Sequence, residues 1–99
     1  KIKPLTKIEN SKEFTVRYND LDVNGHTNNG NYIIWAFEVL PLEFIKNRKI
    51  KTLDVVFKKE SKYDERIISE FEFKDSNTTV HRISNADNED LCLFECQWI

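Results

Sequence analysis

Residues 31–40 read NYIIWAFEVL, and this run decides the fold class because Glu38 is its only charged residue. A continuous apolar run is typical of either a buried strand or a buried helix, and length decides between them. Continued through residues 41–49, the run is too long for one strand, and Pro41 either kinks the helix or begins a second short one. Asn28 or Asn29 is a suitable N-cap. We therefore predict a helix that is buried on all sides.

Strand-like segments lie on both sides of this helix. Residues 13–18, EFTVRY, alternate apolar and polar side chains, which indicates a half-buried strand. Four further strand-like segments follow the helix, at residues 52–60, 66–74, 78–84 and 91–99, separated by short polar turns. Short connections favour antiparallel neighbours. The sequence therefore predicts one α+β domain over residues 1–99, with an antiparallel sheet of about five strands wrapped around one long helix.

Composition excludes several function classes. The chain has 15 basic and 17 acidic residues and a net charge of −2, which gives no sign of a nucleic-acid or membrane-surface protein. No segment reaches the roughly 18 to 20 apolar residues that a membrane span needs, and no signal peptide is visible. The chain also has no methionine, so we expect it to be part of a longer natural chain.

Cysteine and histidine residues outside the central loop give no catalytic or metal pattern. Cys92 and Cys96 lie four residues apart in a predicted strand, about 13 Å apart by strand geometry, which is too far for a disulfide. Zinc needs further ligands at suitable spacing, and His81 alone does not supply them. We predict two reduced, buried thiols, an ordinary sheet histidine and no metal.

The loop at residues 19–29, NDLDVNGHTNN, partly matches a calcium-binding pattern. Its carboxylates, amides and glycine fit the first half of an EF-hand loop. The twelfth position is Asn31 instead of a bidentate glutamate, however, and the preceding segment looks like a strand instead of a helix. An ordinary polar turn between strand and helix explains Asn19 and Asp20 better.

A turn alone does not explain Asp22, Asn24 and His26 at alternate positions. In an extended segment, residues two apart project to the same side, so three hydrogen-bonding or proton-handling groups would converge beside the start of the helix. Free N–H groups and the positive end of the helix dipole at that point suit a developing oxyanion.

Residues 16–41, VRYNDLDVNGHTNNGNYIIWAFEVLP, resemble the signature V-R-Y-x-D-L-D-x-N-x-H-x-N-N-x-x-Y-x-x-W of the acyl-ACP thioesterase family. Residues 55–61, VVFKKES, resemble a second family motif, and Trp98 falls where a family tryptophan is expected. The resemblance covers nearly the whole chain but only the C-terminal half of that family. It implies a hot-dog fold, in which a second hot-dog domain, in cis or in a homodimer, completes the pair.

The resemblance also implies roles for individual residues. Asp22, Asn24 and His26 match the family's D-x-N-x-H catalytic residues, and Glu60 matches its catalytic glutamate. Ser61 stands where plant members have cysteine, which favours attack by an activated water over a thiol nucleophile. We expect Glu60 or His26 to take the proton of that water.

Further residues are expected to hold the substrate. Asn24 and backbone N–H groups near Asn28, Asn29 and Gly30 would stabilise the oxyanion. Trp35 is a candidate contact for the acyl chain, although aromatic residues on a buried helix are more often core.

Glu60 raises a difficulty of geometry. Strict alternation in a strand over residues 52–60 places it with Thr52, Asp54 and Val56, opposite the apolar face. A bulge or the end of the strand would be needed to re-aim its carboxylate. If the strand stays regular, Glu60 is merely a solvated charge.

The expected protein is a cytoplasmic acyl-ACP thioesterase of bacterial type, which releases a fatty acid from acyl carrier protein without metal or organic cofactor. The basic residues Lys46, Arg48, Lys49 and Lys51 either attract the acidic carrier protein or form a solvated loop. Two alternatives stay open: an acyl-CoA thioesterase of the wider hot-dog superfamily, and a structural half that is inactive without its N-terminal domain.

Overall fold

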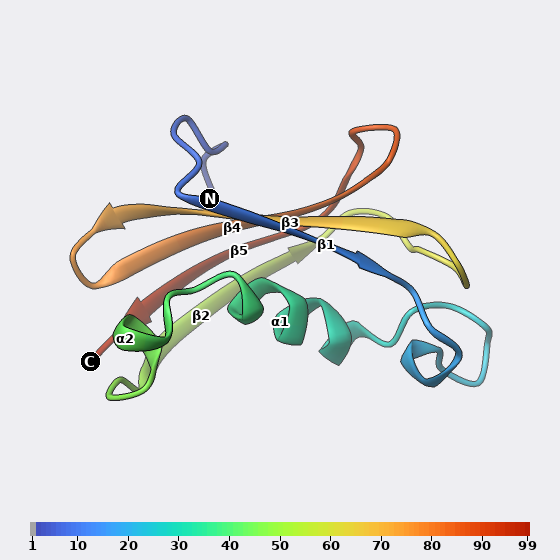
Figure 1. Cartoon of the computed structure of the whole chain (residues 1–99), viewed down its shortest axis with the longest axis horizontal. Helices are drawn as coiled ribbons and strands as arrows, with labels where there is room; N and C mark the ends of the chain where they lie inside the picture. Colours follow the sequence, from blue (N-terminus) through green and yellow to red (C-terminus); the bar gives the residue numbers. More distant parts are fainter. Residues whose placement is uncertain (1) are drawn as a thin grey trace.

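The computed structural model describes residues 2–99, which form one antiparallel sheet and two helices. Figure 1 shows the sheet lying across one side of the longer helix. The elements in chain order are β1 (Asn10–Thr15), the 3₁₀ turn η1 (Tyr18–Asp20), α1 (Asn29–Glu38), α2 (Leu42–Ile45), β2 (Ile50–Phe57), β3 (Arg66–Asp75), β4 (Thr78–Asn85) and β5 (Asp90–Trp98).

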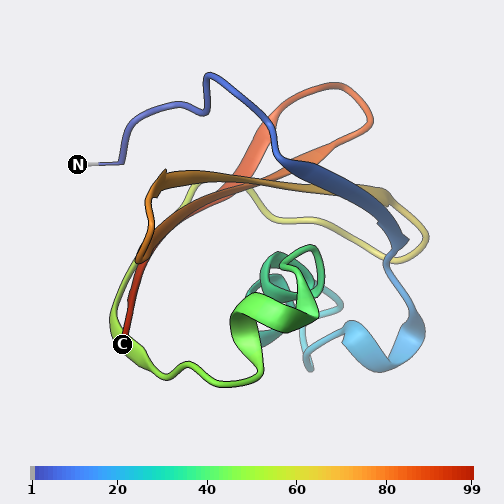
Figure 2. The same cartoon turned by 60° about the vertical axis from the view of Figure 1, so that its left-hand side comes forward.

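The strand order in the sheet is β1-β3-β4-β5-β2, and every neighbouring pair is antiparallel. The three strands that follow one another by short turns occupy the centre. The chain passes from β1 through the helices to β2 at the opposite edge, so α1 lies against the concave face of the curved sheet (Figure 2). The predicted α+β class and wrapped helix are confirmed.

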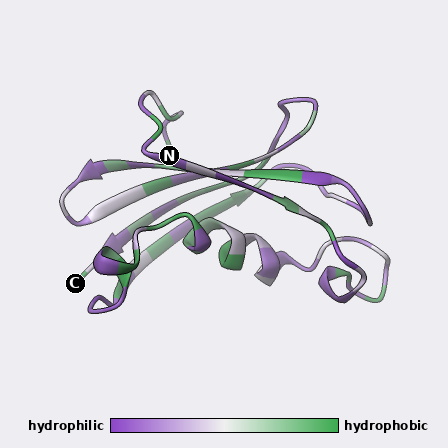
Figure 3. Ribbon diagram, viewed as in Figure 1, coloured by the Kyte–Doolittle hydropathy of each residue, from purple (hydrophilic) through white to green (hydrophobic). Residues whose placement is uncertain are grey.

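The hydrophobic core lies between α1 and the sheet. One part surrounds Trp35 and Ala36, and the other, nearer the end of α1, surrounds Val39 and Trp98. Figure 3 shows hydrophobic residues on α1 and along the strands, whereas the loops at the right of the view are mostly hydrophilic. Within residues 2–99, no helix is long and apolar enough to cross a bilayer.

Two local expectations were wrong. The helix is not buried on all sides, because Ile34 is 60% exposed on the face turned away from the sheet. The first strand ends at Thr15 and not at residue 18, and Tyr18, one of the apolar positions of the predicted half-buried strand, is 78% exposed. The cause is the side chain of Asp20, which accepts the N–H of Arg17 at 2.7 Å and folds the chain into η1.

The helix begins where the sequence predicts it, after one of the two candidate N-cap residues. The side chain of Asn28 accepts the N–H of Gly30 at 2.9 Å and caps α1. Pro41 stands at the N-cap position of the second helix, the short α2, without a side-chain hydrogen bond. The segment 46–51, which carries the four basic residues, follows α2, at the opposite end of the molecule from the loop at residues 21–28 (Figure 1).

Candidate active site

The loop before α1 is a tight turn organised by Asp22. Its Oδ1 accepts the backbone N–H groups of Asn24 at 2.9 Å and His26 at 3.2 Å, and its own N–H donates to the carbonyl of His26 at 2.8 Å. Gly25 completes the turn with a φ of +78°, a conformation that glycine adopts without strain. The carboxylate of Asp22 therefore acts on the backbone that carries His26.

Asp20 fixes the base of this loop to the helix. Its buried carboxylate accepts hydrogen bonds from the guanidinium of Arg17 and from the side-chain amide of Asn31, and its carbonyl accepts the N–H of Asn28 at 2.7 Å. Burial opposes ionisation, but the hydrogen bonds and charge of Arg17 outweigh it and lower the pKa of Asp20. Asp20 therefore shapes the turn, as predicted.

The side chains of His26 and Glu60 are in contact, although the two residues lie far apart in the sequence. Nδ1 of His26 lies 3.2 Å from Oε2 of Glu60, and the backbone of His26 forms an antiparallel bridge with Lys62. The strand β2 ends at Phe57, three residues before Glu60, so the alternation that would have turned this carboxylate away does not extend to it. The imidazole is partly exposed and the carboxylate is 72% exposed, so both are accessible to water.

A cleft of about 420 Å³ lies beside this pair, between the first turn of α1 and the chain that leaves β2. Glu60 forms part of its wall, together with hydroxyl, amide, aromatic and lysine residues: Thr27, Asn29, Tyr32, Phe57, Lys58 and Lys59. Sequence reasoning missed Tyr32 and Phe57 as lining residues. The inward position of Phe57 in the period-2 pattern of β2 was the available signal.

The free N–H groups at the start of α1 are fewer than predicted. Asn28 donates its N–H to the carbonyl of Asp20, and Gly30 donates to the side chain of Asn28, so neither is available. Within residues 2–99, the structure shows no acceptor for the N–H of Asn29. Because Asn29 also lines the cleft, it is the one candidate oxyanion donor of the three.

Two predicted site residues are not brought to the cleft. The side chain of Asn24 is exposed in the turn and forms no hydrogen bond with the described residues. Trp35 is 4% exposed, stacks on Phe14 with a centroid separation of 6.0 Å and meets Tyr32 edge to face. Its position supports a role in the core and gives no support to an acyl contact at this cleft.

Other chemically reactive side chains lie in the core. Cys92 and Cys96 are free and buried, as predicted. His81 is fully buried in β4, where Nε2 lies 2.8 Å from Oγ1 of Thr79, and burial lowers its pKa to about 4. Within residues 2–99, no group of three histidine, cysteine or acidic side chains could hold a metal ion.

Comparison with protein-family models matches residues 3–99 to the acyl-ACP thioesterase C-terminal domain. The chain belongs to this family. A palmitoyl-acyl carrier protein thioesterase of Gossypium hirsutum is 34% identical over 99 residues, which cover 94% of this chain and 22% of the relative. An oleoyl-acyl carrier protein thioesterase of Arabidopsis thaliana is 26% identical and is covered to 25%. The chain thus spans only about a quarter or less of the length of these chloroplast relatives.

Solved structures confirm the hot-dog fold. The 12:0-ACP thioesterase of Umbellularia californica superposes with a TM-score of 0.87 at 24% identity over 99% of this chain and 40% of the other. An acyl-ACP thioesterase of Bacteroides thetaiotaomicron gives a TM-score of 0.84 at 19% identity over 99% of this chain and 42% of the other. The acyl-ACP thioesterase family domain therefore carries its expected fold with the His26–Glu60 pair at one end of the helix.

Proposed function

We propose that this domain takes part in the hydrolysis of acyl-ACP thioesters to free fatty acid and the carrier thiol. The observation that carries the proposal is the 3.2 Å contact between Nδ1 of His26 and Oε2 of Glu60 at the wall of the cleft. Membership of the acyl-ACP thioesterase family supports the substrate class.

The geometry supports Glu60 as the general base. A carboxylate only accepts hydrogen bonds, so Nδ1 of His26 donates to Oε2 and orients the group. Glu60 lines the cleft, whereas His26 lies outside the lining, so the remaining carboxylate oxygen faces the water that attacks the thioester carbonyl. The base removes a proton from this water as its oxygen bonds to the carbonyl carbon, and the carbonyl oxygen becomes the oxyanion.

Asn29 supplies the matching donor. Its N–H has no acceptor among residues 2–99, it lies in the first turn of α1 and it lines the same cleft as Glu60. The positive end of the helix dipole adds to the stabilisation of an oxyanion there. When the tetrahedral intermediate collapses, the carbon–sulfur bond breaks and the carrier thiolate leaves with the proton that Glu60 took from the water, which restores the base. Asn24, exposed in the turn, is proposed to contribute only when substrate is bound.

The chain is proposed to work beside a second hot-dog domain, in cis or as a homodimer. The exposed side of α1 carries Ile34, and the edge strand β2 exposes Val56, which leaves apolar side chains for a partner domain to cover. The solved relatives are more than twice as long as this chain. Sedimentation that shows a well-behaved monomer of this chain would contradict the homodimer. The proposal also includes a bacterial type of enzyme and a cytoplasmic location, which the chloroplast relatives do not support.

Hydrolysis assays test the function. Thiol release is measured with acyl-ACP and acyl-CoA, on this chain alone and on the longer protein that carries it. We expect faster release from acyl-ACP and a loss of at least about a hundredfold in Glu60→Gln, as for removal of a general base. His26→Ala should lose less activity, because the imidazole only orients Glu60 and does not itself take the proton.

Glu43→Gln is the matched control, since among residues 2–99 Glu43 pairs with Lys46 alone, at the far end of the helix layer. Full activity in both Glu60→Gln and His26→Ala would reject the proposed site. Faster release from acyl-CoA would support the acyl-CoA alternative, and activity only in the longer protein would show that this domain needs its partner.

A further inference from the structure

Two contacts hold the segment that carries Glu60: an ion pair at the surface and a hydroxyl cluster in the interior. It lies beyond the last residue of β2, and strand β5 holds its start. The N–H groups of Lys58 and Lys59 both donate to the carbonyl of Leu91, at 2.8 and 3.2 Å. The position of the 72% exposed Glu60 side chain therefore depends on what holds the residues on either side of it.

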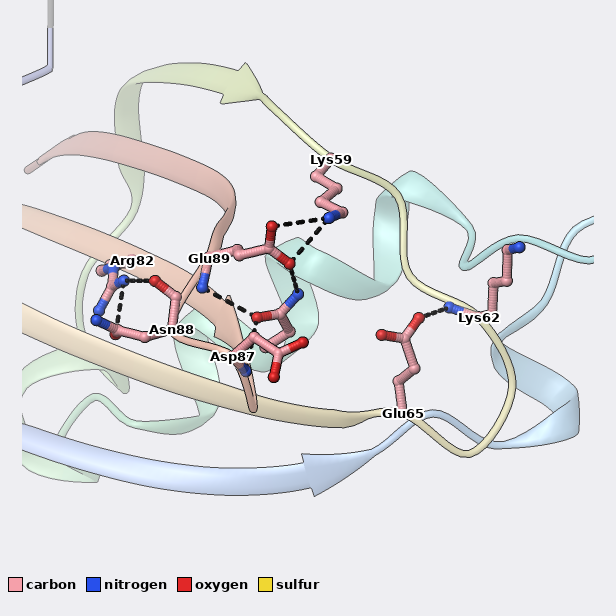
Figure 4. Close-up of polar contacts among 8 residues, drawn as sticks. Lys59, Lys62, Glu65, Arg82, Asp87, Asn88 and Glu89 are labelled. Carbon is pink, nitrogen blue, oxygen red and sulfur yellow. Dashed lines mark hydrogen bonds and ion pairs between the residues drawn. The ribbon is translucent and has the colours of Figure 1, made fainter.

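The outer contact is a surface ion pair. Figure 4 shows Nζ of Lys59 reaching both carboxylate oxygens of Glu89, at 2.8 and 2.9 Å. The side-chain amide of Asn85 also donates to Glu89 at 2.9 Å, which ties the pair to the turn between β4 and β5. Because both partners are about half exposed, solvent and salt weaken this contact.

The inner contact is a buried cluster of three hydroxyl groups. Oγ of Ser61 lies 2.6 Å from Oγ1 of Thr27 and 2.7 Å from the hydroxyl of Tyr32, and all three residues are at most 4% exposed. The N–H and the hydroxyl of Thr27 also lie 2.9 and 3.2 Å from the carbonyl of Ser61. Burial raises the pKa of Tyr32, so its phenol stays protonated.

This cluster joins the three parts of the candidate site. Thr27 follows His26 directly, Ser61 follows Glu60 directly, and Tyr32 lies in the first turns of α1 near Asn29. Hydrogen bonds in a dry interior are stronger than those at the surface, and breaking one leaves a partner unsatisfied. The buried cluster is therefore a firmer anchor than the ion pair of Lys59.

We infer that Thr27, Tyr32 and Ser61 form a positioning cluster that holds the Glu60 carboxylate against His26 and over the cleft. The inference rests on the proposed function, because it explains how the residues of the same site are held in position. Thr27 and Tyr32 line the cleft, but their hydroxyls are bonded to Ser61 in the interior, so the cluster acts through Glu60. A displacement of about 1 Å at the base is expected to cost up to a hundredfold in rate.

Isosteric variants test the cluster. Tyr32→Phe and Thr27→Val remove a hydroxyl with little change of shape, and Thr27→Ser keeps it. We expect kcat to fall by between about tenfold and a hundredfold in the first two, with KM within about twofold. Thr27→Ser should recover most of the kcat lost in Thr27→Val. Glu89→Gln, which breaks the outer ion pair, should keep the activity of the wild type.

A second measurement separates positioning from folding and needs no turnover. The ¹⁵N signal of Nδ1 of His26 reports its contact with Glu60, and Glu60→Gln gives the signal without the carboxylate. Tyr32→Phe and Thr27→Val should move the His26 signal toward that reference while the signal of buried His81 stays in place. If neither this chain nor the longer protein that carries it hydrolyses a thioester, the proposed function fails while this measurement still tests the cluster.

The inference is overturned if kcat keeps its wild-type value in both isosteric variants, or if kcat falls while the His26 signal does not move. The second result would assign the hydroxyls a purely structural role. If the His81 signal shows that Tyr32→Phe has lost its fold, the decision rests on Thr27→Val and its Thr27→Ser counterpart.

Discussion

Oε2 of Glu60 lies 3.2 Å from Nδ1 of His26, although the first residue follows β2 and the second precedes α1. Because the carboxylate is 72% exposed, the pair is screened and contributes less than about 1 kcal/mol to stability. We predict that Glu60→Gln changes the free energy of unfolding by no more than this amount while hydrolysis is lost. Denaturant unfolding followed by circular dichroism measures the first quantity. A large destabilisation would show that Glu60 is structural.

The N–H of Asn29 can be removed without breaking the helix. Proline is tolerated at the first helical position, and Asn28 already has the extended backbone (ψ 133°) that a following proline requires. We predict that Asn29→Pro lowers kcat by about 10² to 10³, the usual effect of losing one oxyanion donor. Asn29→Ala keeps the N–H and should lose much less. Equal losses in both variants would assign the effect to the amide side chain.

Two variants distinguish the negative charge of Asp22 from the hydrogen bonds that its side chain accepts. Its Oδ1 accepts two backbone N–H groups of the turn, and an amide oxygen in Asp22→Asn can accept the same bonds. We predict that Asp22→Asn keeps most of the kcat, whereas Asp22→Ala releases the turn and loses about tenfold or more, as expected for a misplaced catalytic group. Steady-state hydrolysis compares the two. If Asp22→Asn is as impaired as Asp22→Ala, the negative charge itself is needed.

His81 makes the fold sensitive to acid. Burial lowers its pKa to about 4, so the folded state binds this proton less readily than the unfolded state. The unfolded chain takes up the proton first as the pH falls through about 6.5, so stability falls between about pH 6.5 and 4 and levels off below, by about 3 kcal/mol in total.

His81→Gln tests this effect, since glutamine does not titrate. The free energy of unfolding is measured across this pH range, and the variant should show a shallower slope than the wild type even if it is less stable at pH 7. Identical slopes would mean that His81 is protonated in the folded state without cost.

Much of the fold could be predicted from the sequence, because each element has a local signal. Strand-like segments between polar turns predicted the four strands after the helix, Asn28 predicted the start of α1, and Pro41 predicted the second helix, whereas the alternation over residues 13–18 extended the first strand beyond its end at Thr15. The exposed face at Ile34 could not be predicted, because the apolar character of a side chain does not say whether the sheet or another domain covers it.

The site was predicted less completely, since its contacts join segments far apart in the chain. The resemblance named His26 and Glu60, but only the early end of β2 explains how they meet. The loss of two of the three expected N–H donors depends on Asp20 and the cap of Asn28, which no sequence period reveals. The hydroxyl of Ser61 likewise gains its role only from neighbours that the fold supplies.

The two free thiols occupy the strand β5, which β4 and β2 flank on either side. Burial raises the pKa of Cys92 to about 12 and that of Cys96 to about 11, and alkylating reagents attack only accessible thiolates. The thiols of the folded protein should therefore not react with maleimide or iodoacetamide. The rate at which these reagents label the chain therefore measures how often the sheet opens around β5.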